Sequence, residues 1–227
     1  MHQTNRTGLS QDDDTPASVL LAAPEFLRAF QLDGHPVDHR AIARAVADIL
    51  NAVGEDRERE GLLRTPERVA RAYAELLSGY RTDPVWLVNN ALFDVDYDDM
   101  VVVRNIEFAS LSEADLLPFL GHVHVAYIPN GKVIGLSKIP RIVEMFARRL
   151  QAQERFTHQI ADFLEAVLHP KGVAVAVDGF HLSARMRGGH SRRTSVTTHA
   201  VRGVFREDPK ARREFLAQLE QRQSVAL

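Results

Sequence analysis

Two short segments of the chain carry side chains that could move protons. The segment Ser112-Glu113-Ala114-Asp115 contains carboxylates and a hydroxyl, and His181-Leu182-Ser183 contains an imidazole and a second hydroxyl. A carboxylate and an imidazole can act as general base and general acid towards water when they lie within hydrogen-bond reach of it. The chain contains no cysteine, which excludes disulfides, thiolate zinc sites and cysteine nucleophiles together.

The composition predicts one globular domain with a loose N-terminus. The 227 residues are 45% hydrophobic and 26% charged, so the chain can bury a full core. The formal net charge of -2 gives no polybasic signature, and we expect no nucleic-acid partner. No apolar run approaches the length of a membrane span, and residues 1–15 lack the basic start and apolar stretch of a secretory signal. These features predict a cytoplasmic protein with no membrane partner.

The spacing of apolar residues predicts an α+β fold. Helical periodicity predicts helices over residues 38–54, 65–78, 138–150 and 153–168, and a last helix from about residue 209. Runs of β-branched residues predict strands over 100–103, 123–128, 173–177 and 195–204. Helices that follow one pair of strands and precede another favour antiparallel strands with helices on one face.

The chain divides into three predicted regions. Residues 1–36 are rich in Asp, Thr, Ser and Pro and are expected to form a flexible N-terminal extension. An apolar patch within the extension, residues 19–30, could bind a partner, although packing onto the protein's own oligomer is favoured. Residues 37–95 are predicted to form an N-terminal helical segment, and residues 96–227 the catalytic-type domain.

Several motifs in a fixed order carry a resemblance to a known family. They are Thr65-Pro66-Glu67-Arg68-Val69-Ala70, His124-Val125-Ala126-Tyr127-Ile128-Pro129, Val133-Ile134-Gly135-Leu136-Ser137-Lys138, Gln151-Ala152-Gln153-Glu154-Arg155, and Arg187-Gly188 followed by Thr194-Ser195-Val196-Thr197-Thr198. Such a set in order is far more specific than any one motif. From about Ile42 to Leu219 the sequence resembles the GTP cyclohydrolase I family. The resemblance implies the tunnelling fold, in which units of this kind form rings that stack face to face into a homodecamer.

The resemblance also implies a zinc site whose usual ligands are absent here. In the family, Cys-Glu-His-His precedes Leu-Leu-Pro, and a second Cys lies two residues after a His. Zinc held by two Cys and one His activates the water that attacks C8 of guanine. The matching positions in this chain are Ser112, Ala114, Asp115 and Ser183. A neutral serine hydroxyl is a poor zinc ligand, so we expect no zinc, although Mg²⁺ arriving with a triphosphate stays open.

A polar cluster remains where the family has its metal. Its members are the candidate catalytic residues Ser112, Asp115, Ser183 and His181, the last of which matches a family His implicated in proton transfer. In one interpretation they are satisfied polar residues that fill the vacated space. In the other, Asp115 and His181 form an acid/base pair that activates water directly. A replacement metal site could also be built from other histidines, although hydrogen-bonded structural roles are favoured for them: His122, His124, His190 and His199.

The nucleotide-binding half of the family's site is retained. Glu154, with Gln153 beside it, matches the family's guanine-binding carboxylate, which can accept from the ring N–H and the exocyclic amine together. Without that context Glu154 would be interpreted as a solvated carboxylate beside Arg155. Positions matched to the triphosphate ligands are Arg68, Arg71, Ser137, Lys138, Arg141 and Arg187. The hydroxyls of Thr194–Thr198 are either further hydrogen-bonding partners or strand packing residues.

Three hypotheses for the function remain. The first is an enzyme that binds GTP or a related purine nucleotide and hydrolyses its imidazole ring at C8 without zinc, stopping after ring opening. The second is a catalytically silent paralogue that binds the nucleotide as a regulator or as a subunit of a mixed oligomer. The third is a changed purine or pterin substrate. Retention of Glu154 and the cations disfavours a complete loss of ligand binding, and the small polar replacements leave room for water, which favours chemistry.

Overall fold

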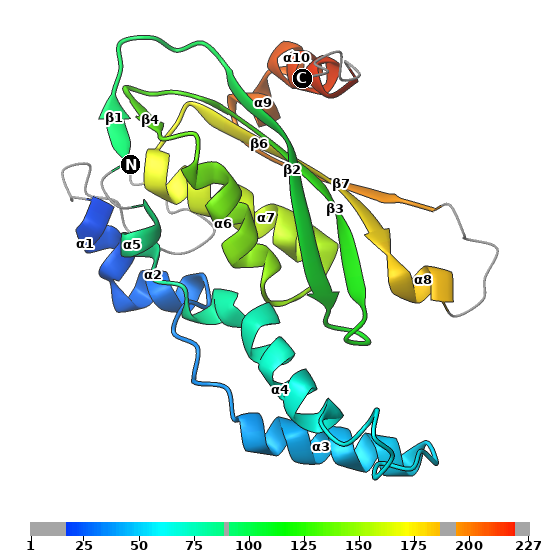
Figure 1. The fold of residues 1–227 in the computed structure, drawn as a ribbon. Helices are drawn as coiled ribbons and strands as arrows, with labels where there is room; N and C mark the ends of the chain where they lie inside the picture. The colour runs from blue at the N-terminus through cyan, green and yellow to red at the C-terminus, as the bar shows by residue number, and fades with distance from the viewer. Residues whose placement is uncertain (1–16, 89–90, 187–193, 221–227) are drawn as a thin grey trace.

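A β-sheet with helices packed across it forms the centre of the protein (Figure 1). The computed structural model describes residues 17–88, 91–186 and 194–220. Within these ranges the main sheet has the strand order β5-β2-β3-β6-β7. The strands are β2 (Val101–Ser112), β3 (Pro118–Ile128), β5 (Leu150–Gln151), β6 (Gly172–His181) and β7 (Val196–Gly203). Neighbours pair antiparallel except β5, which pairs in parallel with β2. The predicted α+β class with an antiparallel sheet is confirmed.

The two faces of the sheet carry side chains of different size. On β3 and β6, valines such as Val125 and Val175 are buried against α6 (Lys138–Ala147) and α7 (Gln153–Leu168). Because side chains alternate along a strand, the adjacent alanines Ala126 and Ala176 lie on the opposite face. There they leave room for Phe205 of α9 (Val204–Glu207) and for α10 (Pro209–Glu220). Helices therefore also cover part of the face that the sequence predicts to be bare.

Strand β2 is much longer than the predicted strand 100–103. The pairing of β2 with β3 shifts register between Val103 and Ile106, and Asn105 has a positive φ of 56°. A β-bulge of this kind inserts an extra residue and interrupts the alternation of polar and apolar side chains. Because of the polar residues at the bulge, the sequence pattern does not predict the second half of the strand, which continues to Ser112.

An α-helical hairpin projects from the body of the protein (Figure 1). It consists of α3 (His39–Ala52) and α4 (Thr65–Leu76), which confirms the two helices predicted there. The Asp38 carboxylate caps α3 by accepting the N–H of Ala41 at 2.9 Å. No residue of α3 is buried, and Ile49 remains 60% exposed. Within the described ranges, part of the apolar face of α3 therefore stays exposed.

The N-terminal segment packs into the core, where a flexible extension was predicted for residues 1–36. Its described part forms α1 (Ala17–Ala22) and α2 (Pro24–Ala29). Phe26 and Phe30 are buried, and their rings lie 5.6 Å and 5.3 Å from the Phe163 ring of α7. The prediction was therefore wrong for this stretch, because the apolar patch packs on its own chain.

A buried arginine joins the N-terminal segment to the rest of the fold. Arg149 is 1% exposed and donates to the carbonyl oxygens of Phe30 at 2.6 Å, Gly79 at 3.0 Å and Met145 at 3.2 Å. The guanidinium also lies 4.7 Å from the centroid of the Phe146 ring. Burial lowers the pKa of Arg149 to about 10, so it is still charged at neutral pH. A single side chain thus satisfies carbonyl groups from three separate segments.

The remaining elements connect these parts. They are the 3-10 helix η1 (Ser78–Arg81), α5 (Pro84–Val88), α8 (Leu182–Met186), and the two-stranded sheet of β1 (Leu92–Asp94) and β4 (Lys132–Ile134). Among the helices of the described residues, none has the length and apolar character needed to cross a lipid bilayer.

Replacing Arg149 by Leu should destabilise the protein strongly. The substitution leaves the carbonyls of Phe30, Gly79 and Met145 buried without a donor, and we expect a loss on the order of 3 kcal/mol in the free energy of unfolding. Chemical denaturation at a fixed protein concentration measures this loss. The more exposed neighbour provides the control: Arg148→Leu removes an ion pair with Glu144 and a hydrogen bond to Glu75 O, both at the surface, and should cost less than about 1 kcal/mol. Equal losses in the two variants would contradict the role given to Arg149.

Candidate functional site

The loop between β2 and β3 closes on itself through two of the candidate catalytic residues. Ser112 Oγ accepts the N–H of Ala114 at 3.2 Å, and Asp115 Oδ1 accepts the N–H of Leu117 at 3.2 Å. Two backbone bonds of 2.9 Å complete the turn, from Ser112 N to Leu117 O and from Leu116 N to Ser112 O. Short polar side chains commonly cap turns in this way. Ser112 and Asp115 therefore shape the loop, in addition to any chemistry.

His181 ends β6 at the same end of the sheet as this loop. It pairs with Phe119, the second residue of β3. The two rings are stacked, with centroids 4.8 Å apart and planes 3° apart. His181 Nε2 lies 2.9 Å from the side-chain oxygen of Gln153. The imidazole is thus held by two contacts, whereas its action as an acid/base pair with Asp115 stays a prediction.

The Gln153 amide is the centre of a buried hydrogen-bond network. The residue is 2% exposed. Its Nε2 lies 3.1 Å from Val177 O, 2.7 Å from Val196 O and 3.2 Å from Thr198 Oγ1. Because Oε1 faces His181, both polar atoms of the amide are engaged within the chain. The structure gives the side chain of Gln153 partners within the chain, and its predicted role in binding substrate stays a prediction.

Thr157 completes this network, although the sequence analysis did not single it out. Its hydroxyl lies 2.7 Å from the Gln153 carbonyl oxygen and 2.6 Å from the Thr198 hydroxyl. Thr157 stands four residues after Gln153, one turn along α7. That spacing is the only signal in the sequence that relates the two residues.

Ser183 lies two residues after His181, within α8. Its side chain is half-buried. In the described part of the chain its hydroxyl makes no hydrogen bond. The start of α8, the Ser112 loop and the start of α7 lie at one end of the sheet, since β3 pairs with β6 at His181 and Ser112 pairs with Gln151. The structure therefore brings the segments of all four candidate catalytic residues to the same region.

Glu154 lies at this end as well, in the first turn of α7. Its side chain is exposed and makes no hydrogen bond or ion pair to any described residue. The positive end of the helix dipole favours a carboxylate at this position. The adjacent Arg155 forms an ion pair with Glu113 and donates to Leu150 O at 2.7 Å. Arg155 thus ties the Ser112 loop to α7 and leaves the Glu154 carboxylate open to a ligand.

The predicted triphosphate ligands do not gather around Glu154 within one chain. Ser137 precedes α6, Lys138 begins it, and Arg141 follows in the first turn. Glu154 comes only after the far end of α6, and a helix of ten residues spans about 15 Å. Arg187 lies outside the described residues.

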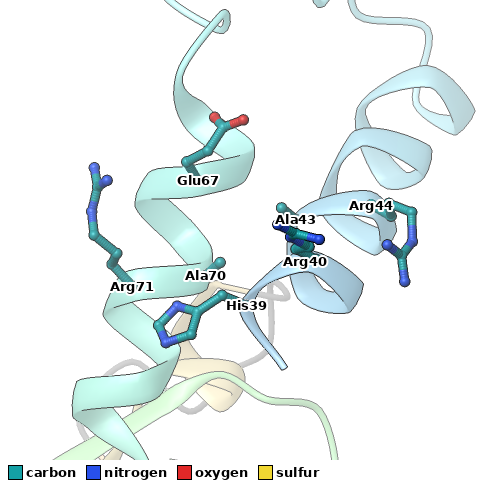
Figure 2. A pocket seen from close by; sticks show the side chains of 7 residues that line it. All are labelled: His39, Arg40, Ala43, Arg44, Glu67, Ala70 and Arg71. Atoms are coloured by element: carbon teal, nitrogen blue, oxygen red, sulfur yellow. The ribbon is translucent and has the colours of Figure 1, made fainter. Parts of the chain in front are cut away.

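Arg68 and Arg71 lie on the projecting hairpin. Arg71 lines a pocket between α3 and α4, with a volume of about 480 Å³ (Figure 2). Its other lining residues include Glu67 and three basic residues of α3: His39, Arg40 and Arg44. Arg71 thus belongs to a basic surface on the hairpin, apart from Glu154 in the same chain.

The alternative histidines do not build a metal site in the described ranges. There, no group of three or more His, Asp or Glu side chains has an arrangement able to hold a metal ion. His124, which is buried, uses both ring nitrogens: Nδ1 accepts the N–H of Asn105 at 3.3 Å, and Nε2 lies 3.7 Å from Asp178. His190 lies outside the described residues.

The side chains at the positions that match the family's zinc ligands do not fit that metal. Protein zinc sites combine thiolate, imidazole and carboxylate ligands in a tetrahedron. Here Ser112 and Ser183 supply neutral hydroxyls, and the chain has no cysteine. One oxygen of Asp115, the anionic member of the three, already caps the loop. No chemical step below is assigned to zinc.

Comparison with known proteins identifies a family and close relatives. The model of the family described as GTP cyclohydrolase I matches residues 42–220. The chain is 53% identical over 173 residues to GTP cyclohydrolase 1 of Campylobacter curvus, which covers 76% of this chain and 91% of that protein. It is 52% identical over 172 residues to the protein of the same name from Chlorobaculum tepidum, covering 76% and 77% of the two chains. With that of Deinococcus radiodurans the identity is 50% over 168 residues, covering 74% and 78%.

Stability should fall below about pH 6.5, in part because of His124. Burial lowers the pKa of its imidazole, and Asp178 opposes the shift. In the unfolded chain this imidazole binds a proton near pH 6.5. In the folded protein it binds the proton only at lower pH. The stability contributed by His124 is complete above that pH and is lost as the pH falls. Urea denaturation between pH 7 and pH 5 should show a shallower decline for His124→Gln. The exposed control His35→Gln should decline as the parent does; no difference between the variants would exclude His124.

Proposed function

Because the chain belongs to the GTP cyclohydrolase I family, we propose that it binds GTP or a closely related purine nucleotide and hydrolyses the imidazole ring at C8 without zinc. The observation that carries the proposal is the position of His181, held at the end of the sheet where Asp115 and Glu154 also lie. An imidazole and two carboxylates thus stand at one end of the sheet, which supports their assignment to acid/base catalysis and purine binding. The reaction is expected to stop after ring opening.

Glu154 is proposed to bind the guanine edge. Its exposed carboxylate has the acceptor geometry for the N1–H and the 2-amino group, which are both donors. Adenine presents an acceptor at N1 instead, so the same carboxylate disfavours ATP. A carboxylate that accepts from two substrate donors loses both hydrogen bonds with an analogue that lacks those donors. Specificity for guanine is therefore assigned to this residue.

The complete site is proposed to form between subunits. Lys138 and Arg141 lie in the first turn of α6, whereas Glu154 follows the last turn of that helix, at the start of α7. Arg68 and Arg71 lie on the projecting hairpin. A triphosphate beside Glu154 therefore takes these cations from neighbouring copies. The uncovered apolar face of α3 supports such an assembly, and the homodecamer of the tunnelling fold is the expected form.

Asp115 and His181 are proposed to move the protons of the hydrolysis. Water adds across the C8–N7 bond of the purine, so that its oxygen bonds to C8 and N7 gains a proton. One of the two residues accepts the proton that water releases, and the other supplies a proton to the ring nitrogen. The C8–N9 bond then breaks as the C8 hydroxyl loses its proton and N9 gains one, which opens the ring and leaves a formyl group on N7. Mg²⁺ accompanying the triphosphate would bind phosphate oxygens and takes no part in these transfers.

A catalytically silent nucleotide-binding paralogue is the alternative, and one observation favours it. Ser112 Oγ and Asp115 Oδ1 are both engaged in the turn, as expected for residues that only fill the former metal position. Such a protein would act as a regulator or as a subunit mixed with an active cyclohydrolase. It would still need Glu154 to bind the nucleotide.

Incubation with GTP separates the two functions. The purified protein, analysed for metal, is incubated with GTP with and without a chelator, and the products are followed by ultraviolet absorbance and mass spectrometry. A hydrated or ring-opened nucleotide formed in the presence of the chelator supports the hydrolase. Tight binding of GTP without product supports the silent paralogue.

Asp115→Asn should abolish hydrolysis and leave the fold and GTP affinity unchanged. The amide oxygen of Asn can still accept the N–H of Leu117, so the turn persists, but the amide cannot take a proton from water. We expect turnover to fall at least about 100-fold. Asp115→Ala should lose turnover in the same way. The exposed Asp99→Ala serves as control, and full activity in Asp115→Asn would exclude a proton-transfer role.

Glu154→Gln should weaken GTP binding and leave ATP binding nearly unchanged. The amide turns a donor towards the donors of guanine, and the expected loss is on the order of 2 kcal/mol, or roughly 30-fold in Kd. Calorimetry with GTP and ATP measures the two affinities. The matched control Glu214→Gln changes an exposed carboxylate of α10. An unchanged preference for GTP in Glu154→Gln would remove the guanine-binding role.

A further inference from the structure

We propose that Gln153 is a positioning residue that keeps the His181 proton on Nε2 and so presents Nδ1 as the atom that exchanges a proton with substrate or water. The assignment of the tautomer follows from contacts within the chain. Its consequence for turnover rests on the proposed function. Two parts of the inference can therefore be tested separately.

The orientation of the Gln153 amide is fixed by its surroundings. One end of the amide lies 3.1 Å from Val177 O and 2.7 Å from Val196 O. Both are carbonyl oxygens and can only accept, so the atom facing them must be the NH₂ group. The other end, the carbonyl oxygen, therefore faces His181 Nε2 at 2.9 Å. Since that oxygen cannot donate, Nε2 carries the proton, and the neutral ring has its lone pair on Nδ1.

The two threonines give the network a single direction. Thr157 Oγ1 donates to the backbone carbonyl oxygen of Gln153 at 2.7 Å. Its hydrogen is then used, so in the 2.6 Å contact with Thr198 the donor is Thr198. The Thr198 hydroxyl in turn accepts from Gln153 Nε2 at 3.2 Å. Both threonine hydroxyl hydrogens thus have a defined acceptor, and the two amide hydrogens of Gln153 are shared among three acceptors. Reversing the Gln153 amide would break these three contacts.

Backbone and ring contacts restrict other arrangements. A Cβ atom on Gly179 would lie 2.0 Å from Gln153 Oε1, so the missing side chain there gives the amide its room. The imidazole is stacked on Phe119, which restricts rotation of the ring. In the part of the chain that the structure describes, Nδ1 has no hydrogen-bond partner. It is therefore the ring nitrogen left for a ligand.

This arrangement suits an imidazole that gains and returns a proton. When Nδ1 accepts a proton, the ring becomes a cation whose Nε2–H already points at the Gln153 oxygen. That dipole stabilises the charged ring without rearrangement. The proton then leaves from Nδ1 to the ring nitrogen of the substrate, and the original tautomer is restored. An imidazole released from Gln153 would populate both tautomers and lose this preference.

The tautomer of His181 in the ligand-free protein is the first test. Solid-state NMR of the full chain, labelled with nitrogen-15 histidine, distinguishes protonated from unprotonated ring nitrogens and is not limited by oligomer size. The chain has ten histidines, and the His181 signals are identified by their loss in His181→Gln. A protonated Nε2 with an unprotonated Nδ1 supports the inference. A proton on Nδ1 in the neutral ring overturns it, whether or not GTP is hydrolysed.

The second test compares two variants of the same helix. Gln153→Met keeps the length of the side chain and removes all its hydrogen bonds. Gln159→Met removes one amide hydrogen bond, to Gln151, and leaves His181 untouched. We expect Gln153→Met to mix the His181 tautomers and to lower kcat at least about tenfold with KM for GTP nearly unchanged. The control should keep both the tautomer and kcat.

The outcomes separate this inference from the proposed function. An altered tautomer in Gln153→Met with unchanged kcat overturns the positioning role while hydrolysis stands. If the parent protein does not hydrolyse GTP, the proposed function fails, and the tautomer of the parent alone decides the inference. If Gln153→Met does not fold, Thr198→Val provides a weaker change. This variant keeps the hydrogen bond between Gln153 and His181, so the His181 tautomer should persist. Loss of the Nε2 proton in Thr198→Val would contradict the circuit.

Discussion

A buried amide has to find a partner for each of its polar atoms inside the protein, and the site depends on how Gln153 does so. Its NH₂ group is used by carbonyls of β6 and β7, which leaves its oxygen for His181. Leaving one of these polar atoms buried and unpaired would cost about 1–3 kcal/mol. The amide therefore stabilises the positions of β6, β7 and His181 relative to one another. The first turn of α7, the ends of two strands and the imidazole are consequently one unit, and their relative positions cannot change independently.

The same constraint acts on a larger scale at Arg149. A buried guanidinium needs several acceptors, and here they come from α2, η1 and α6. Because Arg149 stands one residue before β5, it also fixes the chain that leads into Gln151 and α7. Docking of the N-terminal helices and placement of the α7 N-terminus are therefore linked through one side chain. The helices α1 and α2 thus contribute to the scaffold of the site, although their own residues lie far from it in the sequence.

Local patterns in the sequence predicted the described helices of ten residues or more, α3, α4, α6, α7 and α10, and the antiparallel class. The helix over 153–168 was predicted with its observed bounds, since the helical periodicity is strong and His169-Pro170 ends it. The bulge at Asn105 hid half of β2, and the core position of Phe26 could not be predicted because its partner Phe163 is remote in the sequence. At the site, the positions of Asp115 and His181 followed from the resemblance. The role of Gln153 did not, since its partners lie 24 to 45 residues away and only the fold brings them together.

Two of the residues in place of the family's zinc ligands also close the loop between β2 and β3 through hydrogen bonds of their own. A bound zinc would hold the β2–β3 loop by coordinating side chains at both of its ends. Serine and aspartate are the residues whose side chains cap their own turns, and Ser112 and Asp115 both do so. The loop is thus closed by local hydrogen bonds, and Arg155 ties it to α7 through Glu113. The loop and His181 are thus each held by contacts within the chain, which together set the spacing between them.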